Sequence, residues 1–119
     1  MRKSATLLII CALSMAAAPA MAEKVFGAIA FSNSTGKFGW VKNTATKSDA
    51  QSEAVVQCGV DDCDTVVVFP NCAALSVGDG FGMGFSADKS ASKAEDTALA
   101  QCDGFTTNCI ISTSFCNDK

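Results

Sequence analysis

The sequence contains no His and no Tyr. His is the side chain that titrates nearest to neutral pH, so its absence removes the commonest general base and the usual Ser–His and Cys–His nucleophile pairs. No two Cys residues have C-x-x-C spacing either, which disfavours a zinc site and a thioredoxin-like redox site. These absences favour a protein that is not an enzyme and that uses no metal or cofactor.

Positive charge is also scarce. Residues 23–119 contain seven Lys and no Arg against twelve Asp and Glu, which gives a formal charge of −5. Proteins bind nucleic acids and anionic membranes through clustered Lys and Arg, whereas these Lys residues are scattered along the chain. We therefore expect no nucleic-acid partner.

Long apolar runs are missing after residue 22. Before it, two basic residues precede an apolar stretch, residues 5–18, and a small-residue site at residues 20–22, which is the pattern of a cleaved secretory signal peptide. The stretch is shorter than the roughly 20 residues needed to cross a bilayer. We expect residues 1–22 to be removed and residues 23–119 to form one exported domain, periplasmic or secreted, without a membrane span.

A repeat organises the rest of the chain. The segment Ser48–Cys58 returns 44 residues later as Ser92–Cys102, with Ser, Ala, Ala, Gln and Cys identical at matched positions. A repeat of this length is a supersecondary unit whose apolar face needs a second copy for burial. The sequence therefore predicts two units, at about 24–70 and 71–117.

Each unit has the pattern of two strands, a helix and a third strand. β-Branched and alternating segments indicate strands, turn residues separate the first two, and Ala-rich stripes indicate helices. In the first unit the strands are residues 25–31, 37–42 and 65–69, the turn is Ser32–Gly36 and the helix is residues 47–58; in the second the strands are residues 72–77, 81–85 and 108–115, the turn is Gly78–Gly80 and the helix is residues 90–102.

The predicted fold class is α+β, with two tandem β-β-α-β repeats that form antiparallel sheet with both helices on one face. Capping boxes are expected at the helix starts, formed by Ser48 with Gln51 and by Ser92 with Glu95. The Ala-rich stripes predict that the helices lie close to the sheet. Larger side chains should then dominate the core, and Leu99→Ala should cost about 2 to 5 kcal/mol if Leu99 is buried. These side chains are Val55, Leu99, Trp40 and the Phe residues.

Six cysteines remain once Cys11 of the signal segment is set aside, and an even number in a small exported domain is typical of disulfides. The sequence alone does not choose among the possible pairings. The repeat narrows the choice, because two cysteines end matching helices and each is soon followed by another. The favoured pairs are Cys58–Cys63 and Cys102–Cys109. The two cysteines that are left then form the third pair, Cys72–Cys116.

With these residues placed, the chain resembles the bacterial family named Domain of unknown function (DUF) 4189. The stretches that carry the resemblance are Phe26–Trp40, which contains Gly-Ala-Ile-Ala, and Asn71–Asp79, which contains Cys-Ala-Ala-Leu-Ser. The Ala-rich helices that end at Cys58 and Cys102 extend it over most of residues 23–119. The resemblance implies a small secreted or periplasmic bacterial protein, and it supplies no catalytic residues.

Three features of the sequence contain residue types that occur at catalytic or metal-binding sites. Ser86–Lys89 and Ser90–Lys93 both match S-x-x-K, the nucleophile motif of penicillin-binding proteins, but its companion motifs are absent and helix capping explains the serines. Asp61–Asp64 is an acidic turn that lacks the spacing of an EF-hand calcium loop. Paired carboxylates could serve a glycosidase, although most of the available ones lie on polar helix faces. They are Glu53, Asp79, Glu95 and Asp96.

The sequence favours a non-enzymatic protein-binding or inhibitory module that presents its two hairpin turns to an unknown protein of the envelope or the host. One alternative is a small envelope hydrolase that uses Ser and Lys or paired carboxylates. It requires a deep pocket that contains Ser90, Lys93 or clustered Asp. Another is a structural envelope component that self-associates, for which uncovered sheet edges offer a route.

Overall fold

The computed structural model describes residues 24–118. The expected signal peptide lies outside the described residues. The elements are β1 (Phe26–Phe31), β2 (Phe38–Thr44), α1 (Lys47–Cys58), β3 (Asp64–Phe69), β4 (Cys72–Val77), the 3₁₀ turn η1 (Asp79–Phe81), β5 (Met83–Asp88), α2 (Ala91–Asp103) and β6 (Ile110–Cys116).

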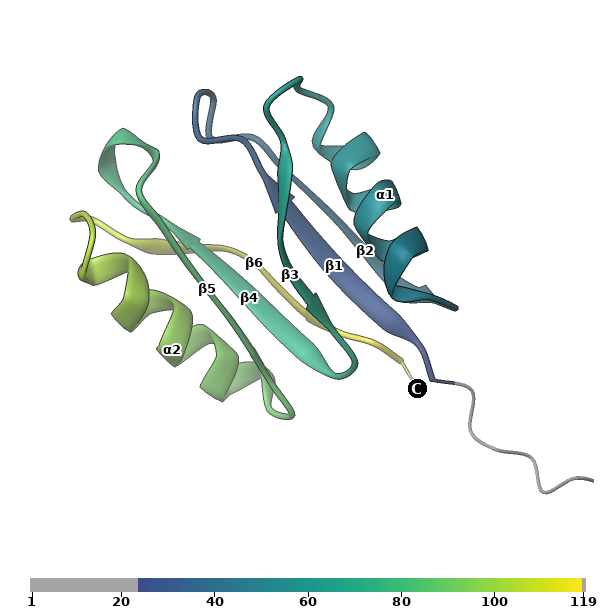
Figure 1. The fold of residues 1–119 in the computed structure, drawn as a ribbon. Coiled ribbons are helices and arrows are strands. Elements are labelled where there is room, and N and C mark those ends of the chain that lie inside the picture. Colours follow the sequence, from purple (N-terminus) through teal and green to yellow (C-terminus); the bar gives the residue numbers. More distant parts are fainter. Residues whose placement is uncertain (1–23, 119) are drawn as a thin grey trace, which may run out of the picture.

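Two three-stranded antiparallel sheets form the centre of the molecule, in the orders β2-β1-β3 and β5-β4-β6 (Figure 1). Helix α1 packs on one face of the first sheet and α2 on one face of the second. The other two faces pack against each other. The layers therefore run α1, first sheet, second sheet, α2.

The cluster between the sheets is the largest part of the core. Its fully buried members are Ile29, Phe31 and Phe69 from the first sheet and Ala73 and Leu75 from the second. The central strands β1 and β4 thus bury side chains on both of their faces, one against a helix and one against the other sheet. Strands buried on both faces read as nearly continuous apolar runs, as these two do.

The α+β class and the two β-β-α-β units are confirmed. Their arrangement differs from the expected sheet with both helices on one face, because each unit forms its own sheet with its own helix. The reason is the apolar character of both faces of the central strands, since a sheet with two apolar faces needs a cover on each.

The N-caps of both helices lie two residues before the first residues of the expected capping boxes. Thr46 is the N-cap of α1 and its side chain accepts a hydrogen bond from Asp49 N, while Ser90 is the N-cap of α2 and accepts one from Lys93 N. Both caps are at matched positions of the repeat. The boxes predicted at Ser48 and Ser92 are therefore wrong, because Thr46 and Ser90 have the extended backbone that a cap requires.

The large side chains expected in the core are distributed differently. Trp40 is 45% exposed, and Val55 and Leu99 are half-buried. Leu75 is fully buried between the two sheets. The loss predicted for Leu99→Ala depends on burial of Leu99, and this condition is met only in part.

Glycine allows the helices to approach the sheets closely. A Cβ at Gly39 of β2 would overlap the main chain of α1 at Ala54 and Cys58, and a Cβ at Gly84 of β5 would overlap the main chain of α2. The buried faces of both helices consist of Ala and Cys. Small residues on helix and strand thus bring the two backbones into contact in both units.

The C-terminal residues join the second unit to the first. Asn117 N donates to Asn71 O, and the Asn117 side chain accepts from Asn43 N at 2.8 Å. Asp118 accepts from the Asn43 amide and forms an ion pair with Lys42 at 3.2 Å. These contacts with Asn43 and Lys42 lower the pKa of the Asp118 carboxyl.

Within residues 24–118, no helix has the length and apolar character to cross a bilayer.

Candidate functional site

Four connecting segments meet at one end of the molecule, which we call the hairpin end. They are the two hairpin turns and the two helix-to-strand loops. Each loop contacts the hairpin turn of its own unit, and the two turns contact each other. Figure 1 shows them where β1 turns into β2, β4 turns into β5, and each helix gives way to the last strand of its unit. The segments are Ser32–Gly36, Gly59–Cys63, Gly78–Gly82 and Gly104–Cys109.

Asp62 holds the first hairpin turn. Its carboxylate accepts a hydrogen bond from Ser32 Oγ at 2.5 Å and one from Ser34 N at 3.1 Å. Ser32 is fully buried, and its hydroxyl also accepts from Thr35 Oγ1 at 2.8 Å. The bond from the Ser32 hydroxyl, followed by those from Ser34, lowers the pKa of Asp62. The adjacent disulfide Cys58–Cys63 ties the loop that carries Asp62 to the end of α1.

Asp79 holds the second hairpin turn in a similar way. Its carboxylate accepts from Thr107 Oγ1 at 2.9 Å and from Asn108 Nδ2 at 2.7 Å, and its carbonyl oxygen accepts from Thr106 Oγ1 at 2.6 Å. The disulfide Cys102–Cys109 ties this loop to the end of α2. In both units an Asp and a disulfide therefore order one turn and one loop.

Phe81 connects the two units at this end. A methyl group on Gly36 would lie 2.5 Å from Phe81 Cδ1, so the ring covers the first hairpin turn. Phe81 has a φ of 62° and follows Gly80, whose φ is 64°. An aromatic residue in the left-handed region costs roughly 1 to 2 kcal/mol relative to its ordinary conformations. The ring is nevertheless 42% exposed.

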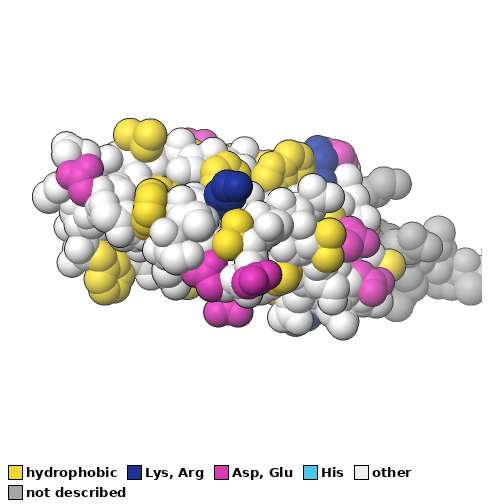
Figure 2. Space-filling model, turned by 90° about the horizontal axis from the view of Figure 1, so that it is seen from above, with side chains coloured by type: hydrophobic (Ala, Val, Ile, Leu, Met, Phe, Trp, Pro, Cys, Tyr) yellow, Lys and Arg dark blue, Asp and Glu magenta, His cyan; other side chains and the backbone are white. Residues whose placement is uncertain are grey.

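The hairpin end also exposes two other large apolar side chains. Phe105 is 75% exposed and Ile110, which begins β6, is 68% exposed. The view from above in Figure 2 shows apolar side chains in separate groups, with acidic side chains more frequent than basic ones between them. Two of the three exposed apolar side chains at the hairpin end are therefore aromatic, Phe81 and Phe105.

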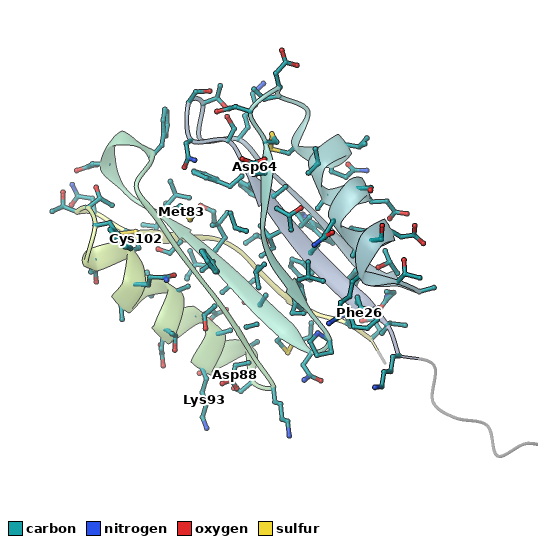
Figure 3. All side chains as sticks on the ribbon, viewed as in Figure 1. Phe26, Asp64, Met83, Asp88, Lys93 and Cys102 are labelled. Atoms are coloured by element: carbon teal, nitrogen blue, oxygen red, sulfur yellow. A yellow bond between two sulfur atoms is a disulfide. The ribbon has the colours of Figure 1, made fainter. Side chains whose placement is uncertain are left out.

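Ser90 and Lys93 lie at the opposite end of α2, in a pocket of about 560 Å³. Figure 3 shows Lys93 and Asp88 there, far along the helix from Cys102. The Ser90 hydroxyl accepts from the main-chain nitrogen of Lys93 at 3.4 Å, and Ser90 N donates to Asp88 Oδ1 at 2.9 Å. Ser90 is thus the N-cap of α2. The pocket is lined by Pro70, Asn71, Cys72, Ala87, Asp88, Lys89, Ser90 and Lys93.

The other predicted site residues lie on different elements and do not form one site. Glu53 and Asp96 are exposed on different helices, and Asp79 orders its own loop. In the acidic turn, Asp62 accepts a hydrogen bond from Ser32 of the first hairpin turn, whereas Asp64 begins β3 (Figure 3). Among residues 24–118 no three Asp, Glu or Cys side chains are grouped as metal ligands.

The cysteines form the three pairs that the repeat favoured, with Cα–Cα distances of 6.1 Å in both local pairs and 3.9 Å in Cys72–Cys116. Sequence reasoning missed the roles of Asp62 and Phe81. The sequence placed Asp62 beside a cysteine in a loop, but its partner Ser32 is distant in the chain. Phe81 was expected in a strand, and only the glycines on both sides indicated a turn.

The comparisons with known proteins are consistent with this fold. The sequence matches the family described as Domain of unknown function (DUF4189) over residues 26–116. It is also similar in structure to Rv1813c from Mycobacterium tuberculosis, whose NMR structure superposes with a TM-score of 0.61 at 23% identity, covering 98% of this chain and 94% of that one. No curated protein matches the sequence.

Proposed function

Starting from the chain's membership of the DUF4189 family, whose description names no activity, we propose that it is an exported, non-enzymatic module that binds or inhibits another protein through the hairpin end. The observation that carries this proposal is Phe81, an exposed aromatic ring held in a left-handed backbone conformation. Such outliers concentrate at ligand clamps and binding sites, where the surrounding structure maintains them.

The order of the surrounding loops supports the same proposal. Binding costs free energy when loops and side chains must be immobilised, and loops that are already ordered avoid much of that cost. Here the Asp62 and Asp79 hydrogen bonds and two disulfides hold all four segments before any partner arrives. Exposed loop residues on such a scaffold are well suited to recognition.

Export is part of the proposal. Three disulfides in so small a domain are typical of oxidising compartments, such as the periplasm and the extracellular space. The predicted signal peptide agrees with this location.

The test is crosslinking of the tagged, oxidised protein in its own envelope, followed by mass spectrometry. Phe81→Asn and Phe105→Ser should each abolish recovery of a partner that the unaltered protein crosslinks. Asn tolerates the left-handed conformation, so we expect the melting temperature of Phe81→Asn to stay within about 4 °C of the original.

Val56→Ser is the matched control, because Val56 is a 75% exposed apolar residue on the outer surface of α1. Equal crosslinking by all three variants would overturn the proposal. Recovery of only the protein itself would instead favour a structural component that self-associates.

A small hydrolase is the second candidate, since the pocket beside α2 contains Ser90, Lys93 and Asp88. The test compares ester hydrolysis by Ser90→Ala and Thr46→Ala. Both remove a helix cap, so both should lower stability by about 1 kcal/mol. Loss of hydrolysis in Ser90→Ala alone would establish the hydrolase, and we expect no such difference.

A further inference from the structure

The edge of strand β2 presents main-chain groups that have no neighbouring strand. Ser32 N donates to Lys37 O at 2.8 Å, so this pair is hydrogen-bonded, and bonded pairs alternate along an antiparallel ladder. Trp40 pairs with Ile29, three positions further on, and therefore belongs to a pair without hydrogen bonds. Its N–H and C=O point away from β1, toward the open edge of the sheet.

In the second unit, one outward main-chain group of the matching edge is bonded to the helix of that unit. Phe85 follows Gly84 as Trp40 follows Gly39, and both glycines contact their helices at equivalent places. Phe85 N donates to Gln101 Oε1 of α2 at 2.6 Å. The outward N–H of Phe85 is thus satisfied within the molecule.

The first unit differs at the matching position. Gln57 occupies the position of Gln101 in α1, but among the described residues no hydrogen bond joins Gln57 to Trp40 N. A groove of about 370 Å³ lies there instead. Trp40 is 45% exposed beside it, with its ring 4.8 Å from that of Phe115. The groove is lined by Phe38, Gly39, Trp40 and Gln57.

Two lysines lie near the ends of the β2 edge, although the protein as a whole is acidic. Lys37 is exposed at one end of β2, and Lys42 lies near the other end, partly paired with Asp118. The corresponding residues of the second unit are Gly82 and Ala87, which carry no charge. The open edge and the two lysines therefore occur together in one unit only.

We propose that the open edge of β2 binds an extended segment of another protein as an added strand, and that this segment carries acidic residues near both of its ends. Main-chain bonds to Phe38 and Trp40 provide affinity, as in other complexes formed by strand addition. The Trp40 ring contacts a side chain of the segment, and the lysines pair with its carboxylates.

A second copy of the chain fits this edge less well. In an antiparallel pair of two β2 strands centred on Trp40, Lys42 of one copy lies opposite Phe38 of the other, and Lys37 lies opposite Asn43. Neither lysine then faces an acidic side chain. Lys on an edge strand is also a common protection against self-pairing.

The test uses synthetic peptides and the oxidised protein. The probe is the capped hexapeptide Glu-Val-Thr-Val-Thr-Glu, whose two Glu are five positions apart, as Lys37 and Lys42 are. The readout is the fluorescence of Trp40, the one Trp in the chain, together with the amide shifts of Phe38 and Trp40. We expect saturable binding. A peptide with N-methyl groups on the residues that face β2, and one with Lys in place of Glu, should each bind at least about tenfold more weakly.

Lys37→Glu supplies a charge-reversal control and should shift preference toward the Lys peptide. Absence of saturable binding at about 1 mM, or equal affinity for the N-methylated peptide, would overturn the proposal. A dimer of the protein alone that alters Trp40 fluorescence would assign the edge to a second copy. Phe81→Asn should leave peptide binding unchanged, so this result is independent of the hairpin end.

Discussion

Two fully buried serines show how much a single residue depends on its partners. Ser32 donates to Asp62 and accepts from Thr35, whereas the Ser76 hydroxyl has no hydrogen-bond partner within residues 24–118. A buried polar group without a partner loses its hydration and gains nothing in return. The same residue type therefore stabilises one site and destabilises the other.

Substitution of each serine by Ala tests this contrast. Ser32→Ala should lower the free energy of unfolding by about 1 to 2 kcal/mol, because it removes a hydrogen bond to a charged group. Ser76→Ala should leave it unchanged or raise it. Urea denaturation of both variants measures the difference, and equal losses would contradict the assignment.

Asp62 should make the protein sensitive to acid. Because the hydrogen bond from Ser32 lowers its pKa in the folded state, its contribution to stability is complete above about pH 5 and is lost as the pH falls through the lowered pKa. Asp62→Asn should therefore lose less stability than the original protein between about pH 5 and pH 2. Urea denaturation across this pH range measures the free energy of unfolding of both proteins, with the neighbouring Asp61→Asn as control. Parallel curves for Asp62→Asn and the original would count against the role of Asp62.

At the scale of elements, the helices and strands could be read from the sequence, but their details could not. The repeat and the Ala stripes predicted both helices close to their observed bounds. The caps were misplaced because Thr46 and Ser48 are both good capping residues, and only the backbone conformation distinguishes them. Phe81 was expected in a strand because nothing local shows that Gly80 and Phe81 both have positive φ.

The contact between helix and strand predicts a severe effect at Gly84. Gly84→Ala would place a methyl group against the main chain of α2 at Ala98 and Cys102, which cannot move as a side chain can. We expect a loss of about 1 to 3 kcal/mol or more, measured by thermal or urea denaturation. Gly80→Ala is the control, since a Cβ at Gly80 meets no atom within 4 Å and only its positive φ is affected. A larger loss at Gly80 than at Gly84 would show that helix and strand are further apart.

At the scale of the whole molecule, the sequence predicted the units but not how they meet. The apolar runs of β1 and β4 showed that both strands are buried. They did not show that one face of each strand would meet a helix and the other face the second sheet. That choice depends on contacts such as Phe69 with Phe115, whose ring centroids are 5.1 Å apart and which belong to different units.

Cys72–Cys116 should contribute more to stability than either local disulfide. It closes a sequence separation of 44 residues, for which the chain-entropy relation gives about 4 kcal/mol, whereas Cys58–Cys63 closes a short loop worth about 2 kcal/mol. Urea denaturation of two double Cys→Ser variants, one without Cys72–Cys116 and one without Cys58–Cys63, compares their losses in free energy of unfolding. A smaller loss for the pair Cys72 and Cys116 would contradict this order.

The shared cluster between the sheets has a consequence for the history of the fold. A chain with only the first unit would expose Ile29, Phe31 and Phe69 on one open sheet face. An ancestor of one unit would therefore have had to pair with a second copy of itself. Duplication placed both copies in one chain, so that their pairing no longer depended on protein concentration. The two edges now differ, since Phe85 N of β5 donates to Gln101 of α2 whereas the edge of β2 carries Trp40 and two lysines.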